Sequence, residues 1–438
     1  MLSIFTSHRT VPGAPARRRH ATGLALLFLA SGLAAASPTA LSLDEALRLA
    51  TAASAAAKAS SAAVAASSQA AARAGQLPDP MLKLGIDNLP VSGPDKFRPN
   101  ADFMTMRRIA IEQQWISRDK RRARSERAQR AVEASEGTHL ENLATVREAT
   151  GKAWLSALYQ QRALALSQSI ARAMEQDLDA LKATFRGAKV SATDVLQAKA
   201  ELIQSGDSVQ AAEQALEGAR INLRRWTRTD VARVADTPPD LSAHVPNLPA
   251  SDLERYHPAV LNALRAVSLA DAEKTVAVRD RNPDWAFEAG FAQRGSQYSN
   301  MVSFGVSIPL NINRAQRQDR DIAEKSELGT KARYEYEETL VDMQSTIQAL
   351  AAQLETLKRR ISRLNAELLP NANQLVDLTL ADYRAGKGTL TAVFKARRAS
   401  LETRLQVNAL ELEAALVWAS LELHVIPHDM AGQSRTTQ

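Results

Sequence analysis

Apolar residues in the second half of the chain are spaced alternately by three and four over nearly thirty positions. They are Leu340, Met343, Ile347, Leu350, Leu354, Leu357, Ile361, Leu364 and Leu368. This spacing is typical of helices that pack as coiled coils. The row lies in a helical stretch from about 314 to 383, where Pro370 predicts a kink, and a rougher version runs through 118–185. A helix of about 70 residues extends roughly 100 Å, so the sequence predicts rods rather than a compact domain.

Two segments recur later in the chain in the same order, which indicates an internal duplication. Pro78, Asp79 and Gly85 reappear 205 residues later as Pro283, Asp284 and Gly290. The segment Phe185-Arg186-Gly187-Ala188-Lys189 reappears 198 residues later as Tyr383-Arg384-Ala385-Gly386-Lys387. We therefore expect repeats at 37–230 and 257–426, a Pro-rich linker at 231–256 and a tail at 427–438.

Each predicted repeat contains a helix, two strands, a very long helix, a turn and a returning helix. The first helix is expected to follow the N-cap Ser42, with Glu45 three residues on, and to continue through an Ala-rich stretch to about Gly75. Its many alanines favour close packing between helices. They are too small to fill an ordinary globular core.

Four short stretches alternate apolar and polar residues as strands do. They are 80–89, 103–115, 284–291 and 301–310, and Arg107-Arg108 interrupts the second. Such strands fit a transmembrane sheet, which must close on itself with at least about eight strands. Four strands cannot close alone, so the sequence favours an oligomer that completes one barrel and packs its helical hairpins into a hollow cylinder. The alternative is a soluble sheet that caps a coiled-coil stalk.

The first 36 residues have the pattern of a cleaved signal peptide. Arg17-Arg18-Arg19 precedes an apolar run that ends in Ala34-Ala35-Ala36, and the run is shorter than the roughly 20 residues of a membrane span. This segment carries four of the seven net positive charges, so the remainder is nearly balanced and gives no charge argument for nucleic-acid binding. The chain has no Cys, which excludes disulfides, thiolate metal sites and lipidation of an N-terminal Cys.

The duplicated order of elements resembles the TolC family of outer-membrane efflux and secretion channels. The resemblance covers about Leu43 to Pro427 and includes Leu368-Leu369-Pro370 and Ala396-Arg397-Arg398. It implies a mixed α/β membrane protein, a homotrimer in which four strands per chain form a twelve-stranded barrel in outer-membrane lipid above an α-helical tunnel across the periplasm. It also implies a periplasmic adaptor protein and an inner-membrane pump of the resistance-nodulation-division type as partners. The short segment 77–90 is similar to the heavy-metal-efflux branch, so heavy-metal cations are the expected cargo.

The resemblance places the periplasmic tips, where the adaptor binds, at the two turns. The expected tip residues are Phe185, Arg186, Gly187, Ala188, Lys189, Tyr383, Arg384, Gly386, Lys387 and Gly388. Asp194 and Tyr383 fall on an Asp and a Tyr that bond across the closed tips. An Arg that the family places near this bond falls on Gly388, and two acidic positions of the second tip fall on Ala392 and Lys395. The cation that helps to close the tips would therefore be Arg384 or Lys387. For Asp194 the alternative is a helix-capping role.

The sequence offers little for catalysis. It has no Gly-rich phosphate loop or nucleophile elbow, and no cofactor is expected. His424 and His428 have the spacing of a helical metal pair, but Pro427 lies between them, so no metal site is expected. His139, His244 and His257 are interpreted as packing or surface residues, and the basic run 118–124 as an interfacial or solvated segment. The prediction is a passive exit duct. The alternatives are a type I secretion duct for proteins, a non-channel periplasmic coiled-coil protein, or an enzyme.

Overall fold

The computed structural model describes residues 40–186 and 191–426. The first helix, α1 (Leu43–Ala53), begins at the predicted N-cap, because the Ser42 hydroxyl accepts a hydrogen bond from the Glu45 backbone N–H at 3.2 Å. The single helix expected to reach Gly75 is wrong. Ser54 adopts an extended conformation and its hydroxyl caps a second helix, α2 (Ala55–Ala74). A Ser hydroxyl competes well for backbone donors at such a break.

The long helices have nearly the predicted bounds. Before residue 231 they are α3 (Arg118–Arg186) and α4 (Ala192–Thr227), and after residue 256 they are α6 (Pro258–Asp280), α7 (Gln318–Arg363), α8 (Leu369–Arg384) and α9 (Leu390–Glu422). Shorter elements are α5 (Ala250–Tyr256) and the 3₁₀ turns η1 (Val245–Asn247) and η2 (Arg314–Gln316). None of the helices in the described part of the chain combines the length and apolarity needed to cross a bilayer.

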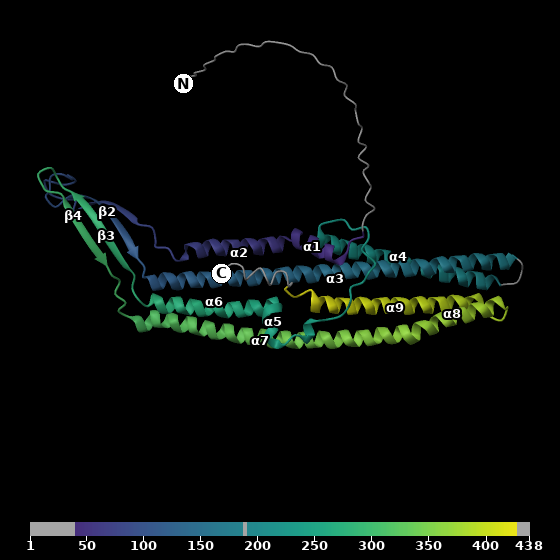
Figure 1. Ribbon diagram of the computed structural model, residues 1–438. Helices are drawn as coiled ribbons and strands as arrows, with labels where there is room; N and C mark the ends of the chain where they lie inside the picture. Colours follow the sequence, from purple (N-terminus) through teal and green to yellow (C-terminus); the bar gives the residue numbers. More distant parts are fainter. Residues whose placement is uncertain (1–39, 187–190, 427–438) are drawn as a thin grey trace, which may run out of the picture. The chain divides into compact units, whose positions relative to one another are not determined.

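The helices pack side by side in an order that Figure 1 shows. One side of α3 packs against α2 and, nearer the turns, against α4, while its other side packs against α6 and α9. Next to these lie α7 and α8, so α2 and α4 form one edge and α7 and α8 the other. Within the described residues, α2 packs mainly on α3 and α8 on α9, whereas α4 also contacts α1 and α9.

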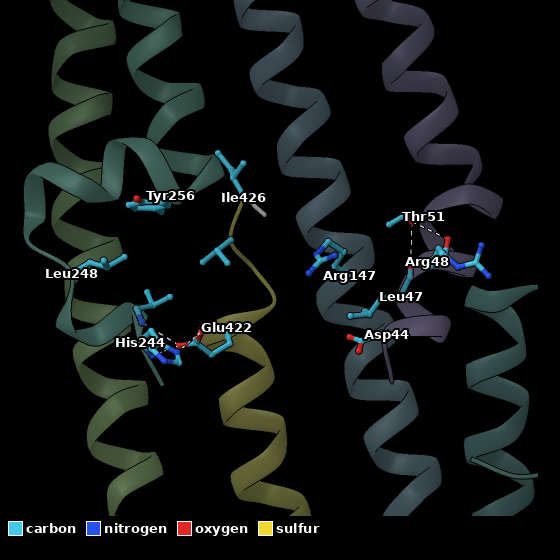
Figure 2. A pocket seen from close by; sticks show the side chains of 12 residues that line it. Asp44, Leu47, Arg48, Thr51, Arg147, His244, Leu248, Tyr256, Glu422 and Ile426 are labelled. Carbon is cyan, nitrogen blue, oxygen red and sulfur yellow. Dashed lines mark hydrogen bonds and ion pairs between the residues drawn. The ribbon is translucent and has the colours of Figure 1, made fainter. Parts of the chain in front are cut away.

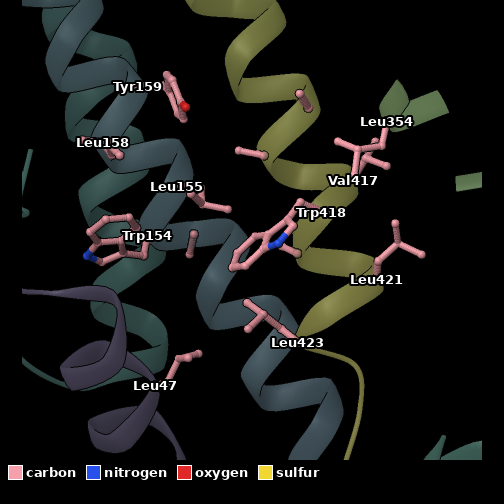
Figure 3. Close-up of a cluster of buried hydrophobic side chains, with 14 of the residues drawn as sticks. Leu47, Trp154, Leu155, Leu158, Tyr159, Leu354, Val417, Trp418, Leu421 and Leu423 are labelled. Atoms are coloured by element: carbon pink, nitrogen blue, oxygen red, sulfur yellow. The ribbon is translucent and has the colours of Figure 1, made fainter. Parts of the chain in front are cut away.

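The main core joins helices from before and after residues 231–256 with that Pro-rich segment. Trp154 and Leu158 of α3 pack with Leu354 of α7 and Trp418 of α9 in one buried cluster (Figure 3). The indole N–H of Trp154 donates to the Leu41 carbonyl at 2.8 Å, and that of Trp418 donates to the Ser242 carbonyl at 3.0 Å. Burying a Trp with its polar group paired stabilises a junction strongly, so this cluster fixes where the helical hairpins meet.

The predicted coiled-coil row is confirmed except at its last residue. Leu354 and Leu357 are buried, and the other members as far as Leu364 pack against the same core. Leu368 is exposed because residues Leu364–Leu368 form a π-helical turn, η3, directly before Pro370. The predicted kink therefore takes the form of a π turn, which places one extra residue in the helix and shifts its register.

The four strands form one antiparallel sheet in the order β1-β2-β3-β4. They are β1 (Met81–Asp87), β2 (Met106–Trp115), β3 (Trp285–Gln293) and β4 (Met301–Ser307). Arg107 and Arg108 lie within β2 and do not interrupt it as the sequence suggested. Strands β1 and β4 have a partner on one side only, so both sheet edges are open in the chain as described.

Candidate functional site

One face of the sheet is apolar across all four strands. The pairing places Leu84 beside Ile109, Ile109 beside Phe291 and Phe291 beside Val302. These side chains are exposed rather than packed, with 70% of Leu84 and 84% of the nearby Phe304 accessible. A contiguous apolar surface of this kind marks an interaction site, and alternation with polar residues is the pattern of a strand that contacts lipid.

The opposite face carries a network of ion pairs that sequence reasoning missed. Glu112 and Glu288 are directly paired across β2 and β3, which would be unfavourable for two carboxylates alone. Lys83 donates to both, at 2.8 Å to Glu288, and Arg108 donates to Glu288 as well. The sequence did contain a signal for this network. Lys83 and Glu288 are 205 residues apart, the same displacement that separates Pro78 from Pro283, so the two positions correspond although their charges are opposite.

Gly290 leaves the room that this network needs. A Cβ at Gly290 would lie 3.0 Å from the Ser303 hydroxyl, 3.1 Å from the Ala110 Cβ and 3.4 Å from the Arg108 guanidinium. The glycine that marked the duplication therefore lets the Arg108 side chain lie across the sheet toward Glu288.

Replacing Lys83 by Met should destabilise the sheet, because it leaves Glu112 and Glu288 facing each other without a cation. We expect a loss of about 1–2 kcal/mol, kept small by the solvent around the Lys83 side chain. Thermal unfolding of the purified protein in detergent measures this. Lys358→Met, which removes only a surface pair with Glu355, is the control, and an equal midpoint for both variants would show that the network contributes nothing.

The turn ends of the long helices meet in a second buried cluster. Its members are Met174, Leu178, Leu181, Ala198, Leu390, Val393 and Phe394, with Ile170, Val195, Leu202, Leu380 and Tyr383 packed against them. These residues come from α3, α4, α8 and α9, so the cluster holds the α8–α9 hairpin against the α3–α4 hairpin. We call it the tip cluster.

Two consecutive arginines of α9 bind the neighbouring hairpin beside the tip cluster. Arg397 forms an ion pair with Asp177 of α3 at 2.6 Å, and Arg398 forms one with Glu201 of α4 at 3.2 Å. Burial raises the pKa of Asp177, while the charges of Arg397 and Arg384 oppose that shift. The Asp177–Arg397 pair is the more enclosed of the two, and its loss would leave a charge in a partly buried site.

The predicted gate residues are only partly brought together. Asp194 forms a capping box with Ser191, which donates its hydroxyl to the Asp194 carboxylate at 2.7 Å. The capping alternative for Asp194 therefore has direct support, and the bond to Tyr383 stays a prediction. Tyr383 packs on the tip cluster, Ala392 donates its N–H to the cap Thr389, and Lys395 is exposed.

The remaining tip residues in the described ranges lie at the ends of α3 and α8 and in the turn that follows α8. Phe185, Arg186, Arg384, Gly386 and Lys387 are exposed, and Gly388 is half-buried. Gly386 has a φ of +72°, the left-handed conformation that glycine adopts without strain. Gly187, Ala188 and Lys189 lie outside the described residues.

Two histidines meet where the start of α6 and the end of α9 contact α3, a region that we call the joint. The rings of His257 and His424 are 5.4 Å apart, and His424 shares a 2.8 Å hydrogen bond with Glu148.

Across residues 40–186 and 191–426, no three His, Asp or Glu side chains are grouped closely enough to hold a metal ion, and His428 lies outside these ranges. His139 bonds to Ser60, and His244 is exposed beside Glu422.

This joint should weaken in mild acid. Burial, helped by the charge of His424, lowers the pKa of His257 to about 4, with Glu148 opposing the shift. A lowered histidine pKa means that stability is complete above about 6.5 and falls as the pH drops toward 4, by about 3 kcal/mol per chain. Denaturation midpoints measured between pH 7 and 4 should show this slope, and His257→Phe should flatten it. An unchanged slope in this variant would mean that His257 does not carry the pH dependence.

A pocket of about 800 Å³ opens beside the joint (Figure 2). Asp44 and Arg147 line one side, and Tyr256 and Glu422 the other. The Glu422 carboxylate accepts the backbone N–H groups of His244 and Val245, so it anchors the linker. Sequence reasoning missed this pocket, because its lining residues are scattered between positions 44 and 426.

The second part of the chain is similar to a known protein family. Residues 250–424 match the family described as outer membrane efflux protein. Comparison with curated proteins gave no match.

Several solved channel structures share the fold along most of the chain. CusC aligns with a TM-score of 0.73 at 14% identity, covering 87% of this chain and 91% of its own. CmeC of Campylobacter jejuni aligns at 0.72 and 13%, covering 87% and 85%. MtrE of Neisseria gonorrhoeae, solved in an open state, aligns at 0.69 and 17%, covering 87% and 88%. Residues 250–424 therefore match the outer membrane efflux protein family, and the chain as a whole shares the fold of these outer-membrane channels.

Proposed function

We propose that three copies of this chain form an outer-membrane channel that serves as the passive exit duct of a tripartite efflux system. The observation that carries the proposal is the sheet, which has an exposed apolar face, a charged opposite face and two open edges. In lipid each open edge must find a partner. Pairing β1 of one copy with β4 of the next closes a barrel of twelve strands after three copies.

The upper helices support the same head-to-tail arrangement. The face of α2 turned away from α3 consists mainly of alanines, including Ala59, Ala62 and Ala66, which are exposed. At the opposite edge α7 exposes Tyr334 and Val341. Small residues on one helix let a neighbour approach closely, so α2 of one copy fits beside α7 of the next, and the helices form a tunnel across the periplasm.

The turn ends of the hairpins are the proposed periplasmic entrance. The exposed residues Phe185, Arg186, Arg384 and Lys387 are the proposed contacts for an adaptor protein, and the energy comes from a resistance-nodulation-division pump in the inner membrane. The tip cluster and the Asp177–Arg397 pair hold the entrance shut until the α8–α9 hairpin moves outward. Asp194, Tyr383, Arg384 and Lys387 remain gate candidates beside them.

Heavy-metal cations remain the proposed cargo on the strength of the short segment 77–90 alone. CusC, CmeC and MtrE match the chain about equally, with TM-scores of 0.73, 0.72 and 0.69. Cargo selection would occur in the pump, since the duct itself needs only an open path.

Fractionation of cells that express the full chain tests the proposal. We expect the mature protein in the outer membrane, beginning at Ser37 after removal of residues 1–36, and migrating as a heat-sensitive trimer on mild detergent gels. A soluble monomer in the periplasm would refute both the barrel and the duct.

A further inference from the structure

The apolar face of the sheet ends in polar side chains, at the end where β1 leaves the sheet and β2 enters it. In the register Ile86 pairs with Arg107, and Arg107 pairs with Gln293. Arg107 lies on the same face as Ile109, two residues further along β2, and both Arg107 and Gln293 are exposed. On a barrel in lipid, this row lies where the hydrocarbon region gives way to the headgroups.

The segment between β1 and β2, residues 88–105, is held against this end of the sheet, and we call it the outer loop. The Arg107 guanidinium donates to the side-chain oxygen of Asn100 at 3.0 Å. Thr105 is fully buried, and its hydroxyl donates to the Asn88 carbonyl at 3.0 Å. A Cβ on Gly295 would lie 2.5 Å from the Asn100 carbonyl oxygen, so the outer loop also touches the turn between β3 and β4. The contact with Arg107 places Asn100 above the apolar face.

The outer loop exposes large apolar side chains. Val91, Phe97 and Phe103 are 69%, 60% and 57% exposed. Phe97 has a φ of +58°, a left-handed conformation that is costly for a bulky residue. Its N–H donates to the Pro90 carbonyl at 2.8 Å, which holds the backbone in this conformation. The loop therefore keeps an aromatic ring on its surface at a cost in backbone energy.

Cations lie beside these apolar side chains. The Lys96 ammonium is 5.3 Å from the centre of the Phe97 ring, and both Lys96 and Arg98 are exposed. Within the part of the chain that the structure describes, Lys96, Arg98 and Arg107 form no ion pair. Arg108, on the opposite face of the sheet, pairs with carboxylates. The three cations are thus available to an anion from outside the chain.

Two acids of the outer loop limit its net charge. Residues 88–107 contain three cations and two acids, Asp95 and Asp102, which leaves an excess of one positive charge per copy. Asp102 accepts the backbone N–H of Met104 at 3.3 Å, so it acts within the loop. Binding of an anion would depend on where the cations lie, next to the lipid-facing surface and the exposed aromatic ring, more than on net charge.

We propose that the outer loop binds an anionic lipid headgroup with exposed phosphate groups, with Lys96, Arg98 and Arg107 on the phosphates and Phe97 at the level of the headgroups. Guanidinium and ammonium groups match phosphate, and aromatic rings favour the boundary between lipid and water. The loop continues the apolar face of the sheet, so a lipid beside that face presents its headgroup to these cations. The proposal rests on the outer-membrane barrel proposed above and adds a specific lipid to it.

Thermal unfolding in mild detergent tests the site with lipid A, which carries two phosphates, as the probe. Lipid A should raise the unfolding midpoint of the full-length protein by several degrees, because a ligand of the native state stabilises it. The same lipid without its phosphates should have little effect. Lys96→Gln combined with Arg98→Gln should lose most of the rise, whereas Lys58→Gln with Lys199→Gln, which removes two exposed cations from α2 and α4, should keep it.

A dye attached to the loop tests the place of Phe97, since the chain has no Cys of its own. Phe97→Cys carrying a polarity-sensitive dye should shift its emission to the blue when lipid A is added to phosphatidylcholine vesicles that hold the protein. The same dye on Lys199→Cys, in α4, should not respond.

The outcomes separate this site from the barrel itself. An equal rise with phosphate-free lipid A, or an undiminished rise in both Lys96→Gln with Arg98→Gln and Arg107→Gln, would overturn the proposal and leave the duct intact. A rise produced by inorganic phosphate alone would mean that the loop binds free anions and would overturn the assignment to a lipid. Protein that fails to float with phosphatidylcholine vesicles would refute the barrel, and the proposed function would fail first.

Discussion

Replacing Leu354 by Asp should abolish assembly of the channel. Leu354 is 1% exposed in the cluster that joins α3, α7 and α9. A carboxylate there would be buried without a partner, and it would also leave a gap where the leucine side chain had packed. We expect a cost of more than about 4 kcal/mol, measured as loss of the folded protein from the membrane fraction and of its cooperative unfolding transition.

Leu354→Met is the matched control, because a volume-conserving change in a packed core costs less than about 1.5 kcal/mol. It should assemble normally. Wild-type yields from Leu354→Asp would mean that the buried seam of α7 is wrongly assigned.

Breaking the Asp177–Arg397 pair should open the periplasmic entrance. In Arg397→Ala the partly buried Asp177 loses its close cation, and the α8–α9 hairpin loses a contact with α3 that we estimate at roughly 1–3 kcal/mol. Three copies multiply the effect. Single-channel conductance in planar bilayers should rise, and Asp177→Ala combined with Arg397→Ala should add little to either single change, since both remove one interaction.

Asp194→Ala is the informative comparison. If Asp194 is only the capping partner of Ser191, its loss weakens the start of α4 by about 1 kcal/mol and leaves conductance unchanged. If Asp194 also bonds to Tyr383, Asp194→Ala and Tyr383→Phe should raise conductance by the same factor and not add. Wild-type conductance in both Arg397→Ala and Asp177→Ala, with the assembly intact, would exclude that pair from the gate.

Much of the architecture was predictable because it depends on periodicity. The three-four spacing up to Leu364 determined the long helices, and alternation around Val302 and Phe304 determined the strands. Ser42 could be recognised as an N-cap because its hydroxyl accepts a hydrogen bond from the first turn of the helix that directly follows it. These signals are local, so each can be recognised within a short stretch of sequence.

The missed features depend on contacts between distant segments. Nothing near Asp177 in the sequence indicates that Arg397 will face it, and the Lys83–Glu288 pair forms only once β1, β2 and β3 are all in register. Leu368 was assigned to the buried row because nothing in its spacing reveals a π turn. Such a turn arises where Pro370 removes a backbone donor from the helix and tertiary packing selects the register.

Single-channel recording of the purified full-length protein in planar bilayers tests the central claim most directly. The account predicts discrete, ohmic conductance steps from the intact oligomer, small in the wild type and larger in Arg397→Ala. Oligomers that insert into the bilayer and give no conductance steps, in the wild type and in Arg397→Ala alike, would contradict a channel.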